Sequence, residues 1–194
     1  MKSIQTLFLI SIALLVFSKS DAQSQFIISI GYSHNAIINQ EVDDIPNIVG
    51  KGAVTVGVQY SLPITTYAEI QFGFRYAASD FEIAPSTLDT KSQLTHQGRY
   101  LSIPVLLRFQ VLPRTYALAG PLLAFDLTKD PSPYINKQSG LGFHLGLAYE
   151  YPYNKLRIGI SPFITNYALV PFQSEDKFRQ AIQVGASLTF GFSL

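Results

Sequence analysis

The chain has 194 residues, enough for one domain or two very small ones. Charged residues make up only 14% of it, against about 25% in typical soluble domains, and its 14 basic residues nearly balance its 13 acidic ones. This balance excludes a nucleic-acid-binding protein that works by neutralising phosphates. The absence of cysteine also excludes disulfides and thiolate metal sites.

The first 22 residues have the pattern of a secretory signal peptide. Lys2 gives a short positive region, Leu7–Phe17 is an uncharged apolar run, and Ser20-Asp21-Ala22 puts small residues where signal peptidase reads them. The run is too short for a transmembrane helix, which needs about 20 residues. We therefore expect residues 1–22 to be removed on export and residues 23–194 to form one barrel domain.

The rest of the chain alternates with a period of two, which is typical of β-strands. Six segments alternate cleanly: Phe26–Ser33, Ala53–Tyr60, Tyr67–Ala77, Leu141–Tyr151, Leu156–Thr165 and Ala181–Leu194. Two further segments, Tyr100–Val111 and Thr115–Phe125, are less regular, and the second is apolar on both phases, so its faces stay unassigned. The pattern predicts eight strands and no helix in this part of the chain.

The connections between these segments alternate in length. Long loops are expected at His34–Gly52, Ala78–Arg99, Asp126–Gly140 and Asn166–Gln180, and short turns at Ser61–Thr66, Leu112–Arg114 and Pro152–Lys155. This order predicts an all-β fold, an eight-stranded antiparallel up-and-down transmembrane β-barrel with elaborated loops at one end. The long loops are expected to hold most of the acids: Glu41, Asp43, Asp44, Asp80, Glu82, Asp89, Asp130, Glu175 and Asp176.

The two phases of the clean segments differ in composition, and this difference decides which face is outside. One phase carries no charged, amide, serine or threonine side chain, and the other is rich in glycine and lacks lysine. Small residues fit the crowded interior of an eight-stranded barrel. We therefore predict that the apolar phase faces lipid, with tyrosine and phenylalanine near both interfaces. The alternative is a soluble, secreted, lipocalin-like barrel that binds an apolar ligand.

Three prolines within the expected strands, Pro104, Pro121 and Pro162, cannot donate to a sheet ladder. We expect β-bulges at these positions, or strand ends displaced from the segments given above.

The segment Tyr100–Phe109 (YLSIPVLLRF) resembles the PorT-like outer-membrane β-barrel family. That family carries Tyr-Leu, then Ile-Pro, an aliphatic run and a basic-aromatic pair in a middle strand, and Ala119-Gly120-Pro121 is similar to its Gly-Pro element. The resemblance implies an outer-membrane barrel of a Gram-negative envelope, mostly without assigned activity. The chain departs from other such barrels in ending on Leu194, with Phe192 as the nearest aromatic residue.

Six ionisable residues on the glycine-rich phase form a candidate lumen charge network: Glu69, Arg75, Arg108, His144, Glu150 and Arg157. Glu150 and Arg157 flank a turn, and Glu69 and Arg108 lie at the turn ends of adjacent strands, so each pair can meet. Buried charges are costly unless they are paired, and eight strands leave too little room for a wide channel. This favours a salt-bridge plug over the alternative, a gated ion path.

The sequence predicts no catalytic residue, cofactor or metal site. His144 and Glu150 share a face but lie about 20 Å apart along a strand, too far for a dyad, so a membrane-embedded lipid-modifying enzyme is a weaker alternative. The acid pairs Asp43-Asp44 and Glu175-Asp176 are interpreted as solvated loop residues rather than calcium ligands.

The expected function is an integral outer-membrane protein with a structural or interaction role. We expect a monomer in contact with outer-membrane lipid, with envelope proteins as candidate partners through loops or periplasmic turns.

Overall fold

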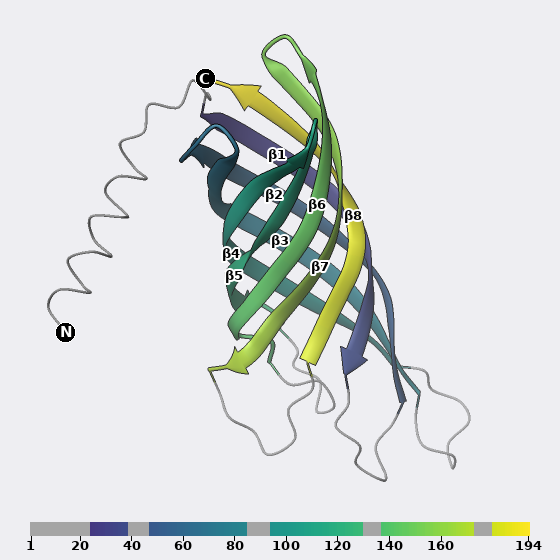
Figure 1. Cartoon of the computed structure of the whole chain (residues 1–194). Helices are drawn as coiled ribbons and strands as arrows, with labels where there is room; N and C mark the ends of the chain where they lie inside the picture. The colour runs from purple at the N-terminus through teal and green to yellow at the C-terminus, as the bar shows by residue number, and fades with distance from the viewer. Residues whose placement is uncertain (1–23, 39–46, 85–93, 130–136, 173–179) are drawn as a thin grey trace, which may run out of the picture.

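The computed structural model describes residues 24–38, 47–84, 94–129, 137–172 and 180–194, and in them eight strands form a closed barrel (Figure 1). Each strand is antiparallel to its neighbours in the sequence, and the last pairs with the first. This confirms the predicted fold class. The strands are β1 (Gln25–Ile38), β2 (Asn47–Pro63), β3 (Ala68–Ala84), β4 (Leu94–Leu112), β5 (Thr115–Asp126), β6 (Gly140–Tyr153), β7 (Leu156–Pro171) and β8 (Gln180–Ser193).

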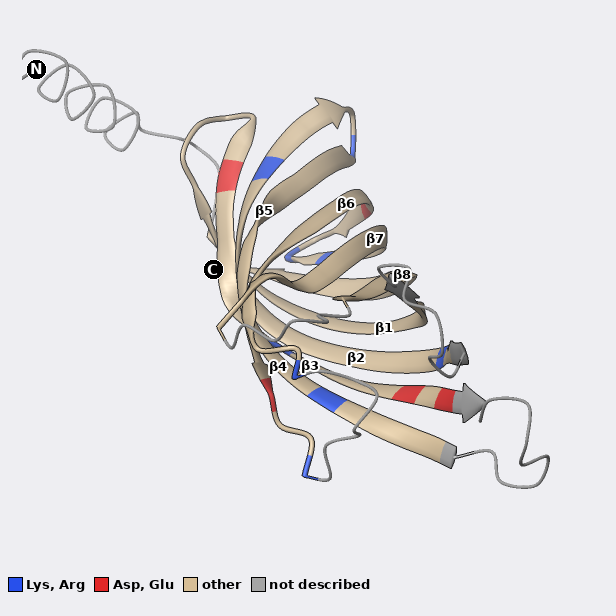
Figure 2. Ribbon diagram, turned by 90° about the horizontal axis from the view of Figure 1, so that it is seen from below, with Lys and Arg blue, Asp and Glu red and all other residues tan. Residues whose placement is uncertain are grey.

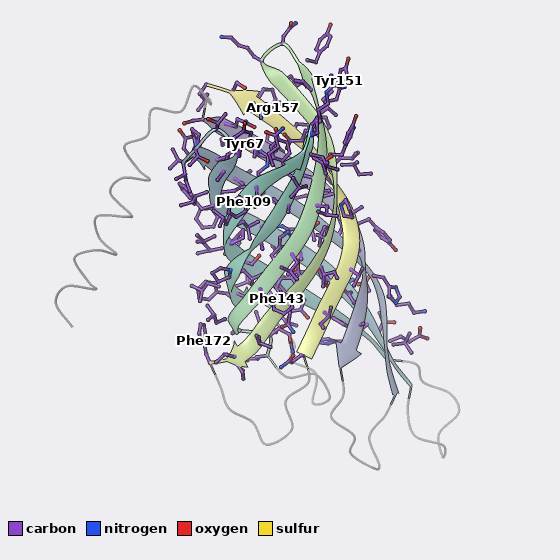
Figure 3. All side chains as sticks on the ribbon, viewed as in Figure 1. Tyr67, Phe109, Phe143, Tyr151, Arg157 and Phe172 are labelled. Carbon is purple, nitrogen blue, oxygen red and sulfur yellow. The ribbon has the colours of Figure 1, made fainter. Side chains whose placement is uncertain are left out.

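The apolar phase of the six cleanly alternating segments faces outward, as predicted. On β2, Val54, Val56 and Val58 are 51%, 45% and 44% exposed, whereas Ala53 and Thr55 on the opposite phase are 1% and 3% exposed. Figure 2 shows that charged residues colour only short stretches of the wall, and Figure 3 shows side chains projecting from it all along the barrel. An apolar outer band suits acyl chains, and a closed ring leaves no strand edge with unpaired backbone groups in hydrocarbon. The fold is therefore a transmembrane β-barrel.

The strands are longer than the alternating pattern predicted, mainly at the end opposite the short turns. The strand β2 begins at Asn47, β3 ends at Ala84, and β4 begins at Leu94. The long loops predicted from the sequence are correspondingly too long, and Asp80 and Glu82 lie in β3, not in a loop. The pattern fails there because a strand that has left the bilayer no longer needs an apolar outer face.

The short turns lie at the end of the barrel that also holds the C-terminus (Figure 1). Two of them have two residues, Pro113-Arg114 and Asn154-Lys155, and their Arg114 and Asn154 adopt left-handed backbone angles, with φ of 63° and 56°. Positive φ is typical of the tight turns that match strand twist. The predicted turns are therefore confirmed, with bounds that shift by one or a few residues.

The expectation of bulges at the strand prolines is wrong. The register is constant through Pro104, Pro121 and Pro162, and the register shifts lie between Gly50 and Ala53, Gln110 and Leu112, and Leu141 and Phe143. Each proline keeps its pairing with one neighbouring strand and interrupts the pairing with the other. This is possible because the N–H and C=O of one residue in an antiparallel ladder point to the same neighbour.

Aromatic and aliphatic side chains fill the lumen near the long-loop end. We call this group the tyrosine layer: Ala77, Phe81, Tyr100, Leu122, Ala124, Tyr167 and Ala181. The rings of Tyr100 and Tyr167 stack with centroids 4.9 Å apart. The Tyr167 hydroxyl donates to Gln183 Oε1 at 2.6 Å, and Gln183 Nε2 donates to Ser79 Oγ at 2.8 Å. The layer fills this part of the lumen, and the Tyr167 hydroxyl within it is hydrogen-bonded.

Candidate functional site: the charged lumen

Arg108 on β4 is the centre of the lumen network near the short-turn end. Its side chain is 1% exposed and forms ion pairs with two carboxylates. Its Nη1 atom lies 2.9 Å from Glu69 Oε2, and its Nη2 atom lies 2.6 Å from Glu150 Oε2. Glu69 is directly opposite Arg108 on β3, whereas Glu150 reaches it from β6, two strands away. The guanidinium therefore links three strands across the lumen.

Neighbouring groups complete the surroundings of this cation. Ser61 Oγ donates to Glu69 Oε2 at 2.6 Å, which anchors the carboxylate from β2. The Arg108 guanidinium lies 3.7 Å from the centroid of the Tyr116 ring on β5, a cation–π contact. Charge, hydrogen bonds and an aromatic face thus all act on one buried side chain.

Arg157, labelled in Figure 3, does not lie directly opposite Glu150, the residue that the sequence predicts as its partner. In the register Glu150 pairs with Gly159 and Arg157 pairs with Pro152, so the two charged residues are diagonal neighbours. Their closest atoms, Arg157 Nη1 and Glu150 Oε2, are 4.0 Å apart. With its amide oriented to accept, Gln25 places an oxygen 2.7 Å from the same Nη1 atom. Glu150 therefore has its closer cation in Arg108, a partner that the sequence did not indicate.

Arg75 and His144 form a second group, which makes no ion pair with the carboxylates of the first. Arg75 Nη1 lies 2.9 Å from His144 Nδ1, and that nitrogen lies 2.7 Å from Thr165 Oγ1. The Phe163 ring stacks on the imidazole and also lies beneath the guanidinium, 4.9 Å from its carbon. Because a guanidinium can only donate hydrogen bonds, the imidazole nitrogen facing it accepts.

A small cavity separates the two groups. It has a volume of about 30 Å³ and is lined by both arginines, His144 and Glu150, with hydroxyl groups from β1, β7 and β8. This volume holds about two water molecules. Polar side chains thus share the lumen between the short turns and the tyrosine layer with a small apolar cluster of Leu106, Leu118 and Ala148.

The six predicted lumen residues all line or flank this interior, in two groups: Glu69, Arg108, Glu150 and Arg157 at the turn end, and Arg75 with His144 at mid-barrel. Sequence reasoning missed Asp126, which accepts backbone N–H groups from Thr128 and Gln138, each at 2.9 Å, at the mouth of the barrel. It was assigned to a loop because it lies just beyond the last apolar residue of β5.

The described residues contain no arrangement typical of a catalytic or metal centre. The ring nitrogens of His144 contact Arg75 and Thr165, and no acid is among their partners. Within the same residues no three His, Asp or Glu side chains gather closely enough to hold a metal ion. In this part of the chain no helix is long and apolar enough to cross a membrane. The acid pairs at residues 43–44 and 175–176 lie outside the described residues.

No protein-family model and no curated protein matches the chain. Solved structures do match its fold. The outer-membrane protein OprG from Pseudomonas aeruginosa has a TM-score of 0.52 and 12% identity, over 90% of this chain and 98% of its own. The outer-membrane protein AlkL, solved in lipid bilayers, has a TM-score of 0.48 and 12% identity, over 91% and 95%. Ail of Yersinia pestis has a TM-score of 0.43 and 16% identity, over 87% and 100%. At such identities the likeness to OprG establishes a shared fold.

Proposed function

We propose that this chain is an integral outer-membrane β-barrel protein of a Gram-negative envelope, with a structural or interaction role and a closed lumen. The observation that carries the proposal is the combination of a closed ring, an apolar outer wall and a polar, filled interior. Such a ring is stable in lipid because every strand is paired and every lipid-facing side chain is apolar. The predicted signal peptide and the resemblance to PorT-like barrels support the same location.

In this proposal the lumen network is a plug that sets the position of strands, not a channel. Arg108 joins β3, β4 and β6, and the tyrosine layer fills the lumen on its long-loop side. Buried ions in such a site are tolerated because they are paired. The protein would then act through its long-loop end and its contacts with lipid, as a monomer and without catalysis.

The two alternatives have less support. A soluble carrier of an apolar ligand needs a polar wall and an apolar cavity for the ligand, whereas this barrel has an apolar wall and a filled lumen that contains buried charged side chains. A lipid-modifying enzyme needs a reactive group that the lipid can reach, but His144 is buried inside the lumen and has a cationic neighbour.

Membrane fractionation tests the location. The full-length chain, expressed in a Gram-negative host, should resist carbonate extraction, require detergent and show heat-modifiable gel mobility, and its mature form should begin at Gln23. Val56→Ala is the matched control for Val56→Arg, which should assemble less efficiently because it places a charge in the lipid-facing band. Carbonate-soluble wild-type protein without heat modifiability would refute the proposal.

Planar-bilayer recording separates the plug from an ion path. The wild-type barrel should show no resolved conductance steps, because side chains fill the lumen. Steady, step-like currents from protein of confirmed purity would favour the ion path instead.

A further inference from the structure

Arg75 is a cation inside the lumen without a carboxylate partner. None of the ion pairs among the described residues includes it, and its contacts are the His144 ring and the face of Phe163. The barrel wall around it is surrounded by hydrocarbon. A charge in such surroundings is costly unless a counter-charge lies close to it.

The charge count shows that the nearby residues do not supply this counter-charge. The turn-end group contains two carboxylates, Glu69 and Glu150, and two guanidinium groups, Arg108 and Arg157, so its formal charge is zero. Both carboxylates already contact Arg108. The positive charge of Arg75 therefore remains uncompensated in the described lumen between the tyrosine layer and the short turns.

The cavity beside Arg75 has the size and the donors for a small anion. It measures about 30 Å³ and is lined by the guanidinium groups of Arg75 and Arg108, by the carboxylate of Glu150 and by hydroxyl groups that include Thr189, so the formal charges of its Arg and Glu side chains sum to +1. Thr189 Oγ1 is buried and has no hydrogen-bond partner. A buried hydroxyl without a partner is unfavourable and indicates a bound species in the space beside it. Room for about two water molecules accommodates a halide ion and excludes a larger oxyanion such as sulfate.

We propose that this cavity is a binding site for one small monovalent anion of the halide class, held by Arg75 and by the hydroxyl of Thr189. The anion neutralises the cation and satisfies the unpartnered hydroxyl. The site rests on the lumen geometry and does not depend on where in the cell the barrel resides.

The thermal stability of the detergent-extracted, refolded barrel tests this site. We compare the midpoint temperature of heat-modifiable gel mobility in sodium bromide or chloride with that in sodium gluconate at equal ionic strength. A ligand that binds only the folded state raises the midpoint in proportion to the logarithm of its concentration. The wild type should show this rise with halide and not with gluconate, and Arg75→Met should abolish it. Arg157→Gln, the matched control, removes a lumen cation outside the site and should retain it.

Crystals grown in bromide give a second, independent readout. An anomalous peak within hydrogen-bond distance of the Arg75 guanidinium supports the proposal, and peaks on the outer surface alone mean an adventitious ion only and overturn it. If Arg75→Met does not fold, Thr189→Val, which removes only the hydroxyl, should weaken the halide effect. Equal midpoints of the wild type in halide and gluconate, or a halide effect unchanged by either substitution, would also overturn it.

Discussion

Replacing Arg108 with methionine should be among the most damaging single changes in the lumen. The substitution keeps most of the side-chain volume but removes the cation that lies 2.9 Å from Glu69 and 2.6 Å from Glu150. Two carboxylates then remain in the interior, each without its closest counter-charge. Breaking a buried ion pair by removing one partner costs about 3–5 kcal/mol, and loss of the cation–π contact with Tyr116 adds about 1 kcal/mol. We therefore expect the free energy of unfolding to fall by about 4–6 kcal/mol.

Urea unfolding of the barrel refolded in detergent micelles measures this loss. The triple variant Glu69→Gln, Arg108→Met, Glu150→Gln should recover most of it, because the interior then contains no unpaired charge from this group. Arg157→Gln should cost less than about 1 kcal/mol, because the Arg157 side chain is 26% exposed and 4.0 Å from its carboxylate partner. A loss below about 1 kcal/mol for Arg108→Met, or a triple variant as unstable as the single one, would contradict the reasoning.

Three further predictions concern the wall and the network. Val56→Arg should lower the free energy of unfolding in lipid by about 2–4 kcal/mol, because a charge at mid-bilayer is unfavourable; unchanged stability would reverse the assigned facing. Exchanging Glu150 and Arg157 should be as harmful as Glu150→Arg alone, because either change places a second cation beside Arg108; urea midpoints compare the two, and rescue by the double exchange would contradict this contact. In a chain without native cysteine, a cysteine at Val56 should react with a lipid-soluble label, whereas one at Thr55 should not. Equal labelling of both would argue against a lipid-facing wall.

The number, order and facing of the strands could be predicted because one physical constraint acts along most of the chain. A lipid-facing position must be apolar, and its neighbours face a crowded lumen, so alternation appears in the sequence. Ile28, Ile30 and Tyr32 on β1 follow it without exception, and all three are exposed in the structure. The constraint ends where the strands leave the bilayer, which is why Asp80 and Glu82 were assigned to a loop.

The faces of β5 could not be predicted because both of its phases are apolar. In the structure Leu118 and Leu122 point into the lumen, and Ala119 and Pro121 point outward. Leu122 faces inward because it packs in the tyrosine layer, where the lumen is filled by apolar side chains. Only the set of residues that meet across the lumen decides this, and those residues are far apart in the sequence.

The partner of Glu150 shows a second limit of sequence reasoning. Pattern arguments compare adjacent strands, and they placed Glu150 beside Arg157, across one turn. In a narrow barrel long side chains also reach strands that are not adjacent, and Arg108 does so from β4 to β6. Whether Glu150 pairs with Arg108 or with Arg157 depends on the exact bounds of the turns and on the register shift between Gln110 and Leu112. The alternating pattern defines neither the bounds nor the shift.

The lumen is therefore asymmetric along the barrel axis, and this asymmetry follows from the cost of burying charge. The ion pairs of Glu69, Arg108 and Glu150 lie at the turn end, where the partly exposed Arg157 gives access to water. The tyrosine layer fills the opposite end with stacked rings and aliphatic side chains. Arg75 lies between these two regions, where its guanidinium contacts the His144 ring and the face of Phe163 and, among the described residues, no carboxylate.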